Sequence, residues 1–261
     1  MLLLAVCEVI GGVVVSRALL DVFVPFCLLG SVLSAVGLHA LGLAQHESFH
    51  RLLFRTRRLN DVAGRLLCSW VLFTQYSQLK RAHLAHHRNF GAPDDPDFWH
   101  WDRNGSGRKS KKLLFEVLFF RRLWISMVNN RAVGRDLLRN GELAYVVLVQ
   151  VVILLAIVST AGPVVYAVGW LLPLFSIMPL LEHIRVVAEH HGSSLRVFLS
   201  PNPLEYWVFG RFGFAFHGYH HQNPRLHWFG LSRVSSATEP LTFCAEKSRS
   251  WVGEFMVAMR R

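Results

Sequence analysis

Apolar residues gather into long runs separated by polar segments, which is the pattern of helices that cross a membrane. The runs at residues 22–44, 143–160 and 164–181 contain no Asp, Glu, Lys or Arg. A hydrocarbon core about 30 Å thick takes roughly 20 apolar helical residues to cross, so each run predicts a transmembrane helix. Residues 1–17 are also largely apolar, but this run is shorter and contains Glu8, so the pattern leaves open whether it spans.

Short connections join these runs in pairs. Residues 17–21 separate the first two runs, and Ala161-Gly162-Pro163 separates the last two. We therefore expect an all-α integral membrane protein of one domain, residues 1–261, with about four transmembrane helices in two hairpins and a helical cap. The apolar stretch at residues 206–216 is too short to span, so we expect it to lie at the interface or to re-enter the membrane.

Charge is distributed unevenly along the chain, and this predicts its orientation. The chain is 52% hydrophobic and 17% charged, with a net charge of +11, and residues 51–141 contain 18 of its 28 lysines and arginines. Arginines stand at the ends of both hairpins: Arg51, Arg55, Arg57, Arg58, Arg131, Arg135 and Arg139. Because positive residues flank spans on the cytoplasmic side, both hairpins should begin and end there. Runs of bilayer length exclude nucleic-acid binding as the reason for this basic charge.

Two smaller features of the sequence are a basic segment and the spacing of the cysteines. Residues 102–112 (DRNGSGRKSKK) are predicted to form a mobile basic loop near anionic headgroups. The four cysteines are widely spaced and form no C-x-x-C pair, so we expect them to be reduced packing residues.

Histidine is the unusual residue type of this sequence, with 14 copies that mostly fall in clusters. The pattern H-x-x-x-H occurs at residues 46–50, H-x-x-H-H occurs at 83–87 and again at 217–221, and His190-His191 follows the last apolar run. Positions i, i+3 and i+4 lie on one face of a helix, so each H-x-x-H-H box is expected to offer three imidazoles to one point. So many nitrogen ligands exceed the needs of one tetrahedral zinc and suit two metal ions in the cap. Imidazole binds iron, copper, nickel and zinc alike, so the ligands alone do not select the metal.

The remaining histidines are more ordinary. We interpret His39, His100 and His227 as satisfied core or surface residues, although His39 lies two turns before His46 and could face a substrate. His183 lies seven residues before His190 and could point inward or outward. Acidic residues after the second box, Asp94, Asp95 and Asp97, could accept imidazole N–H groups and orient the ligands, or could form a solvated turn.

Two other kinds of protein remain possible at this point. Residues 46–50 (HESFH) also match H-E-x-x-H, in which two histidines bind zinc and the glutamate is the general base of a metalloprotease. That mechanism leaves most of the clustered histidines unexplained, and the later apolar runs contain no Asp for a further ligand. A non-enzymatic metal-binding or transport protein is the other alternative, but Leu143–Leu181 contains no ionisable carboxylate or base to line a path.

From about residue 40 to residue 233 the chain resembles the membrane fatty-acid desaturase superfamily of histidine-box, non-haem di-iron enzymes, which also includes carotenoid ketolases and lipid hydroxylases. The resemblance rests on HESFHRLLF, on QLKRAHLAHHRNFGAPDDPDF with its acidic tail, on RVVAEHHG, and on HGYHHQNPRLHWFGL. Glu47 stands where many members have Asp, which is a mild departure.

The resemblance implies the metal ligands residue by residue: His46, His50, His83, His86, His87, His190, His217, His220 and His221. His191 stays uncertain, because neighbouring residues on a helix point about 100° apart and only one of His190 and His191 can face a given metal. RVVAEHHG matches an R-x-x-x-E-H element, which favours His190 and gives Arg185 and Glu189 a supporting role.

The resemblance also implies the chemistry. Two iron ions would use O2 to desaturate a fatty acyl chain carried as a lipid, an acyl-CoA or an acyl-carrier substrate. Hydroxylation or ketolation of a lipid, alkane or carotenoid is the alternative, because the same ligands serve both. The chain has no haem-binding H-P-G-G, so electrons should come from an external ferredoxin-, rubredoxin- or cytochrome-type donor. We expect an integral protein of a bacterial inner membrane with its active site on the cytoplasmic side.

Overall fold

Four long helices form the apolar part of the molecule. The computed structural model describes residues 1–20, 22, 27–97, 141–191, 195–231 and 245–260. Helices α1 (Leu2–Leu20), α2 (Cys27–Phe49) and α8 (Glu142–Ala161), and the helical run Pro163–His190, are each long and apolar enough to cross a membrane. The expectation of an all-α membrane protein with about four such helices is therefore confirmed, and the first apolar run forms one of them.

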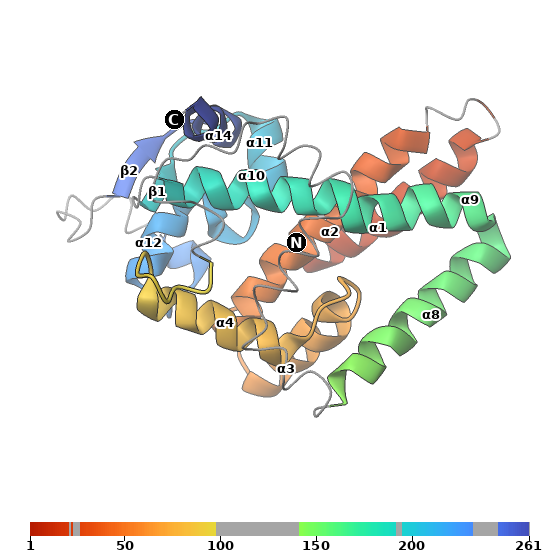
Figure 1. Ribbon diagram of the computed structural model, residues 1–261, viewed down its shortest axis with the longest axis horizontal. Helices are drawn as coiled ribbons and strands as arrows, with labels where there is room; N and C mark the ends of the chain where they lie inside the picture. The colour runs from red at the N-terminus through yellow and green to blue at the C-terminus, as the bar shows by residue number, and fades with distance from the viewer. Residues whose placement is uncertain (21, 23–26, 98–140, 192–194, 232–244, 261) are drawn as a thin grey trace.

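The fourth helical run is longer than its apolar sequence. It consists of α9 (Pro163–Tyr166), the π-helical turns η4 (Ala167–Leu171) and η5 (Pro173–Ile177), and α10 (Met178–His190). The predicted span ended at residue 181, whereas the helix continues to His190 because the polar residues of its last turns find partners inside the protein. In Figure 1 this run connects α9 at one end of the molecule with the cap around α12 and β1 at the other.

Small residues allow α1 and α2 to pack closely as an antiparallel hairpin. A Cβ atom added to Gly12 would lie 2.5 Å from the carbonyl oxygen of Gly30, so the two backbones are in contact at this point. Ser34 Oγ also donates to the carbonyl of Val9 at 3.3 Å. Close backbone approach through Gly and Ser is typical of helix pairs in membranes, where burial from water supplies no driving force.

Glu8, the acidic residue of the first span, is buried and paired. Its Oε2 accepts from Arg211 Nη1 at 2.7 Å, and its Oε1 accepts from Trp207 Nε1 at 3.0 Å. The pairing explains how an acidic residue is accommodated within an apolar helix, because a buried carboxylate needs an opposite charge.

The cap is built from short elements. These are α3 (Arg57–Ala63), η2 (Gly64–Ser69), α4 (Tyr76–Asn89), β1 (Leu195–Phe198), α11 (Pro203–Phe209), η7 (Arg211–Phe216), α12 (His217–Gln222), β2 (Ala245–Ser248) and α14 (Trp251–Arg260). β1 and β2 pair in parallel, with Leu195 opposite Ala245 and Phe198 opposite Ser248. This small sheet was not expected from the sequence, because each strand has only four residues.

The apolar stretch at residues 206–216 folds back against the spans. It comprises the end of α11 and all of η7, where the left-handed backbone of Phe212 (φ 54°) and Gly213 (φ 81°) kinks the chain. Phe212 and Phe214 then join the buried core that contains Val9 of α1 and Leu38 of α2. The segment does not cross the molecule, as its length predicted.

Some expectations concern residues that the structure does not describe: the loop at 102–112, Arg131, Arg135, Arg139, His100 and Cys244. The three cysteines that are described, Cys7, Cys27 and Cys68, are free.

Candidate metal centre

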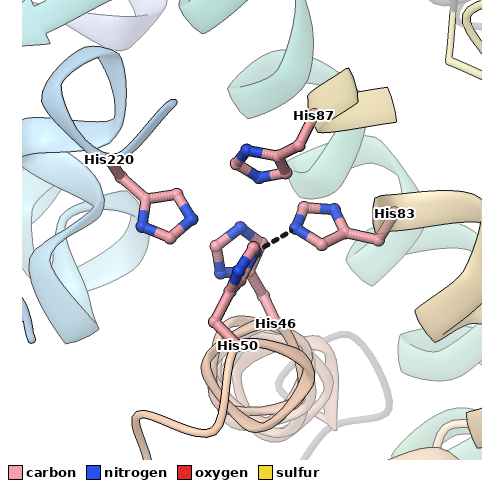
Figure 2. Close-up of side chains that lie close together, drawn as sticks. All are labelled: His46, His50, His83, His87 and His220. Atoms are coloured by element: carbon pink, nitrogen blue, oxygen red, sulfur yellow. Dashed lines mark hydrogen bonds between the residues drawn. The ribbon is translucent and has the colours of Figure 1, made fainter. Parts of the chain in front are cut away.

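Five histidines from three helices converge in one cluster, shown in Figure 2. They are His46 and His50 at the end of α2, His83 and His87 of α4, and His220 of α12, and one nitrogen of each lies within 4.8 Å of the others. Ring centroids are 4.3 Å apart for His46 and His83, and 4.5 Å apart for His50 and His220. Nε2 of His50 and Nε2 of His83 are 2.7 Å apart. We call this group the five-histidine cluster.

Four more histidines form a second, adjoining group. His86, His190 and His221 bring their nitrogens within 4.8 Å of one another, and His190 also lies within that distance of His217 and Glu189. Nε2 of His221 is 3.0 Å from that of His217 and 3.2 Å from that of His190. We call His86, His190, His217 and His221 the four-histidine cluster. The two clusters touch where His87 stacks on His221, with ring centroids 4.2 Å apart.

Each H-x-x-H-H box is divided between the clusters, which corrects the expectation that a box faces one point. In α4, His83 and His87 enter the five-histidine cluster while His86 enters the other. In α12 the division is reversed. His220 joins the five-histidine cluster, whereas His217 and His221, four residues apart, join the four-histidine cluster. The reason is helical geometry: His86 and His87 point about 100° apart, so one helix can supply two neighbouring centres.

The state of these imidazoles suits metal binding. His46 Nε2, both ring nitrogens of His87 and His220 Nε2 are buried without a hydrogen-bond partner among the described residues. Burial, reinforced by the neighbouring imidazoles, lowers the pKa of His83 and His221 well below the usual value. Burial and the charge of Lys80 lower the pKa of His50 to about 4. The imidazoles of His50, His83 and His221 are therefore neutral near pH 7, with lone pairs available to a cation. The nitrogen set of the two clusters fits two divalent transition-metal ions.

Hydrogen bonds on the far side of some rings fix their orientation. His86 Nδ1 donates to Asp95 Oδ1 at 2.8 Å, and His190 Nδ1 donates to the carbonyl of Val186 at 2.9 Å. Asp95 is itself held by the backbone N–H groups of Gly91 and Asp97, both at 2.9 Å. With the proton held on Nδ1, Nε2 is left as the acceptor that faces the cluster.

The other two acidic residues after the second box contribute less. Asp97 Oδ2 lies 3.8 Å from His86 Nδ1. Asp94 accepts from the side chain of Asn89 at 2.9 Å on the surface.

Glu189 and Arg185 lie beside the four-histidine cluster. Glu189 is completely buried, forms an ion pair with Arg185, and accepts from Trp251 Nε1 at 3.3 Å. Its Oε2 is 3.7 Å from His217 Nε2. Arg185 also pairs with Glu182, and its guanidinium lies 4.8 Å from the ring centroid of Phe214.

Sequence reasoning missed three of these partners. Phe214, Glu182 and Trp251 occur in no motif, and only the fold brings them to the cluster.

The histidines outside the boxes have other partners. His191 Nε2 donates to Glu254 at 2.8 Å, and His183 lies against Phe255 with ring centroids 5.8 Å apart, so both face α14. His39 is buried, donates to the carbonyl of Val208 at 3.0 Å and lies 3.4 Å from Glu182. His227 stacks on Trp228 and Phe229. None of the four belongs to a potential metal group within the described residues.

Fold and site together define a helical membrane protein with two adjoining histidine clusters that could hold metal ions. The family model for fatty acid desaturase matches residues 23–252, so the chain belongs to the fatty acid desaturase family. A zeaxanthin 4-ketolase of Chlamydomonas reinhardtii is 42% identical over 60 residues, which is 22% of this chain and 14% of that protein.

Proposed function

We propose that this protein is a membrane-bound, O2-dependent di-iron oxidoreductase that desaturates a fatty acyl chain. The observation that supports it is the pair of adjoining clusters, nine buried or half-buried imidazoles with nitrogens directed at two neighbouring points. We assign one iron to the five-histidine cluster and the other to the four-histidine cluster, within a single domain of residues 1–261.

The protein itself would hold the ligand rings in place and exclude water from the centre. Bound iron with O2 would supply an oxidant strong enough for an unactivated C–H bond, which no side chain provides. Asp95 and the carbonyl of Val186 hold two ligand rings in place. Aromatic rings cover the centre, since Phe214 lies 4.7 Å from His46 and Phe90 lies 5.1 Å from His221, measured between centroids. Such a dry surround keeps the ligands neutral and protects a reactive centre from water.

Ketolation or hydroxylation of a carotenoid or lipid is the second candidate. The local similarity to a zeaxanthin 4-ketolase favours it, although the match covers only 14% of that protein. The same ligands would serve both reactions, so the position of the substrate above the metals would decide between them.

A zinc protease is disfavoured by the surroundings of HESFH. His46 and His50 share their cluster with three further histidines, and Glu47 Oε1 lies 3.2 Å from His46 Nδ1. Glu47 is therefore placed to orient a ligand.

We further propose that the metal centre lies on the cytoplasmic side, which in a bacterium is the inner face of the inner membrane. The exposed arginines Arg51, Arg55, Arg57 and Arg58 directly follow the first box and support this orientation. A soluble ferredoxin-, rubredoxin- or cytochrome-type donor would reach the centre from that side.

Lipid analysis tests the reaction. Cells expressing the chain should gain lipids two mass units lighter, with a new double bond, and cells expressing His220→Ala should not. New hydroxyl or keto lipids or carotenoids would select the second candidate. An unchanged lipid and carotenoid profile, in cells whose purified protein holds iron and is supplied with a donor, would refute both.

A further inference from the structure

The segment after the first histidine box exposes apolar side chains outside the four long helices. Leu59, Val62 and Leu66 of α3 and η2 are 52%, 55% and 47% exposed, and Leu67 is 38% exposed. Residues 59, 62 and 66 are spaced i, i+3 and i+7, so they form one outward stripe. The opposite face is small or polar and is buried, with Asn60 and Cys68 both 0% exposed. This arrangement is inverted relative to a helix of a soluble protein, whose outward face is polar.

Arginines border this stripe. Arg51, Arg55, Arg57 and Arg58 are exposed, and the structure gives them no carboxylate partner among the residues it describes. Arg65 is half exposed, with its Nε 3.6 Å from Glu142 Oε1. Apolar side chains flanked by arginines are typical of a helix that lies in the plane of a membrane surface.

The neighbours of η2 place the segment where spans enter the bilayer. Trp70, directly after η2, stacks on Tyr145 of the first turn of α8, with ring centroids 5.1 Å apart. Gln150 of α8 donates to the carbonyls of Trp70 and Val71 at 3.0 and 2.9 Å. Figure 1 shows α3 beside this end of α8. Trp and Tyr gather at the level of the headgroups, so the stripe continues the apolar surface of α8 at the membrane boundary.

We propose that α3 and η2 form an in-plane membrane anchor, with Leu59, Val62 and Leu66 inserted among acyl chains and Arg55, Arg57 and Arg58 bound to anionic phospholipid headgroups. An acidic protein could use the arginines, but it would leave the leucines and the valine in water. The bilayer accommodates both kinds of side chain.

The anchor is fixed rigidly to the metal centre. Asn60 Oδ1 accepts from the backbone N–H groups of Leu53 and Phe54, at 3.0 and 3.1 Å, just after His50. Tyr76 of α4 donates to the carbonyl of Ser48 at 3.2 Å, and a Cβ on Gly64 would lie 2.3 Å from the Tyr76 ring. The anchor would thereby set the height of the first histidine box above the bilayer.

Photocrosslinking of the full chain in its native membrane tests the occupant. Val62→p-benzoylphenylalanine should give phospholipid adducts, detected as intact-mass shifts, and Arg249→p-benzoylphenylalanine, at an exposed polar site of the cap, should give few. A protein adduct at residue 62, or equal lipid adducts at both sites, would overturn the proposal.

A second experiment tests the headgroup. In nanodiscs of phosphatidylcholine and phosphatidylglycerol, crosslinking from residue 62 should favour phosphatidylglycerol, and Arg55→Gln with Arg57→Gln and Arg58→Gln should reduce that preference by about tenfold. The matched control, Lys247→Gln with Arg249→Gln and Arg260→Gln, removes three cap charges outside the anchor and should leave it unchanged. An undiminished preference in the Arg55/57/58 variant, with both variants monodisperse, would refute headgroup binding. Neither readout depends on metal content or activity, so the anchor and the proposed reaction can fail separately.

Discussion

At the scale of residues, the direction in which each imidazole points decides whether it joins a histidine cluster, and its presence in a motif does not. His190 and His191 are adjacent, yet His190 joins the four-histidine cluster and His191 turns to Glu254 of α14. The backbone explains this divergence, because α10 ends at His190 and His191 adopts an extended conformation (φ −63°, ψ 147°).

The first prediction compares these two neighbours. His190→Ala should lose iron from the four-histidine cluster and abolish turnover, because it removes a ligand. His191→Ala should keep its iron, because His191 donates to Glu254 and belongs to none of the potential metal groups among the described residues. Iron content and turnover of both variants would check this, and loss of iron from His191→Ala alone would reverse the assignment.

A second prediction concerns the carboxylate behind His86. Asp95→Asn should weaken iron binding by about 10- to 100-fold, because the amide holds the Nδ1 proton of His86 less strongly and the ligand becomes less basic. Asp94→Asn, one residue away on the surface, is the control and should behave as the parent protein. Iron retention against a graded chelator measures both, and equal retention would show that Asp95 is only a turn residue.

At the scale of elements, the helices do more than cross the membrane. α4 and α12 each supply both clusters, because ligands at i and i+4 share one direction while the ligand at i+3 points elsewhere. α1 contributes no ligand to a described cluster, but it packs against α2, which carries His46 and His50.

The third prediction tests that packing with two adjacent glycines. Gly12→Ala should lower the Tm by about 4–8 °C, because the added Cβ would lie 2.2 Å from Ser34 Oγ and 2.5 Å from the Gly30 carbonyl. Gly11→Ala should have little effect, because its nearest neighbour is Leu33 Cδ2 at 3.8 Å. Thermal unfolding in detergent measures the difference. Equal Tm values would contradict the close approach of the helices.

At the scale of the whole molecule, the metal site joins segments that are far apart in the sequence. α2, α4, α10 and α12 each supply ligands, so metal bound to the clusters would tie both hairpins to the cap.

The fourth prediction follows from this arrangement. The purified protein should contain two irons per chain, and removing them with a chelator should lower the Tm, because a ligand that binds only the folded state stabilises it. Metal analysis and thermal unfolding of the same sample provide the test. One stoichiometric zinc, unchanged in His217→Ala and His220→Ala, would instead revive the protease hypothesis.

The sequence by itself determined the class of fold, because spans of apolar residues and boxes of histidine are local patterns that need no tertiary information. It also indicated the family, and it predicted that residues 206–216 are too short to span. Two features were not predicted correctly. Each H-x-x-H-H box was expected to direct all its histidines at one metal centre, and the four-residue strands β1 and β2 gave no recognisable pattern in the sequence.

Only the tertiary structure assigned His86 and His87 to different clusters, and likewise separated His220 from His217 and His221. This assignment depends on which helices face each side of α4 and α12. It alone paired Glu8 with Arg211 and brought Trp251 to Glu189, contacts between residues 203 and 62 positions apart. Motifs record spacing along one helix, whereas a metal centre and a buried charge are completed by groups that meet only when distant helices pack.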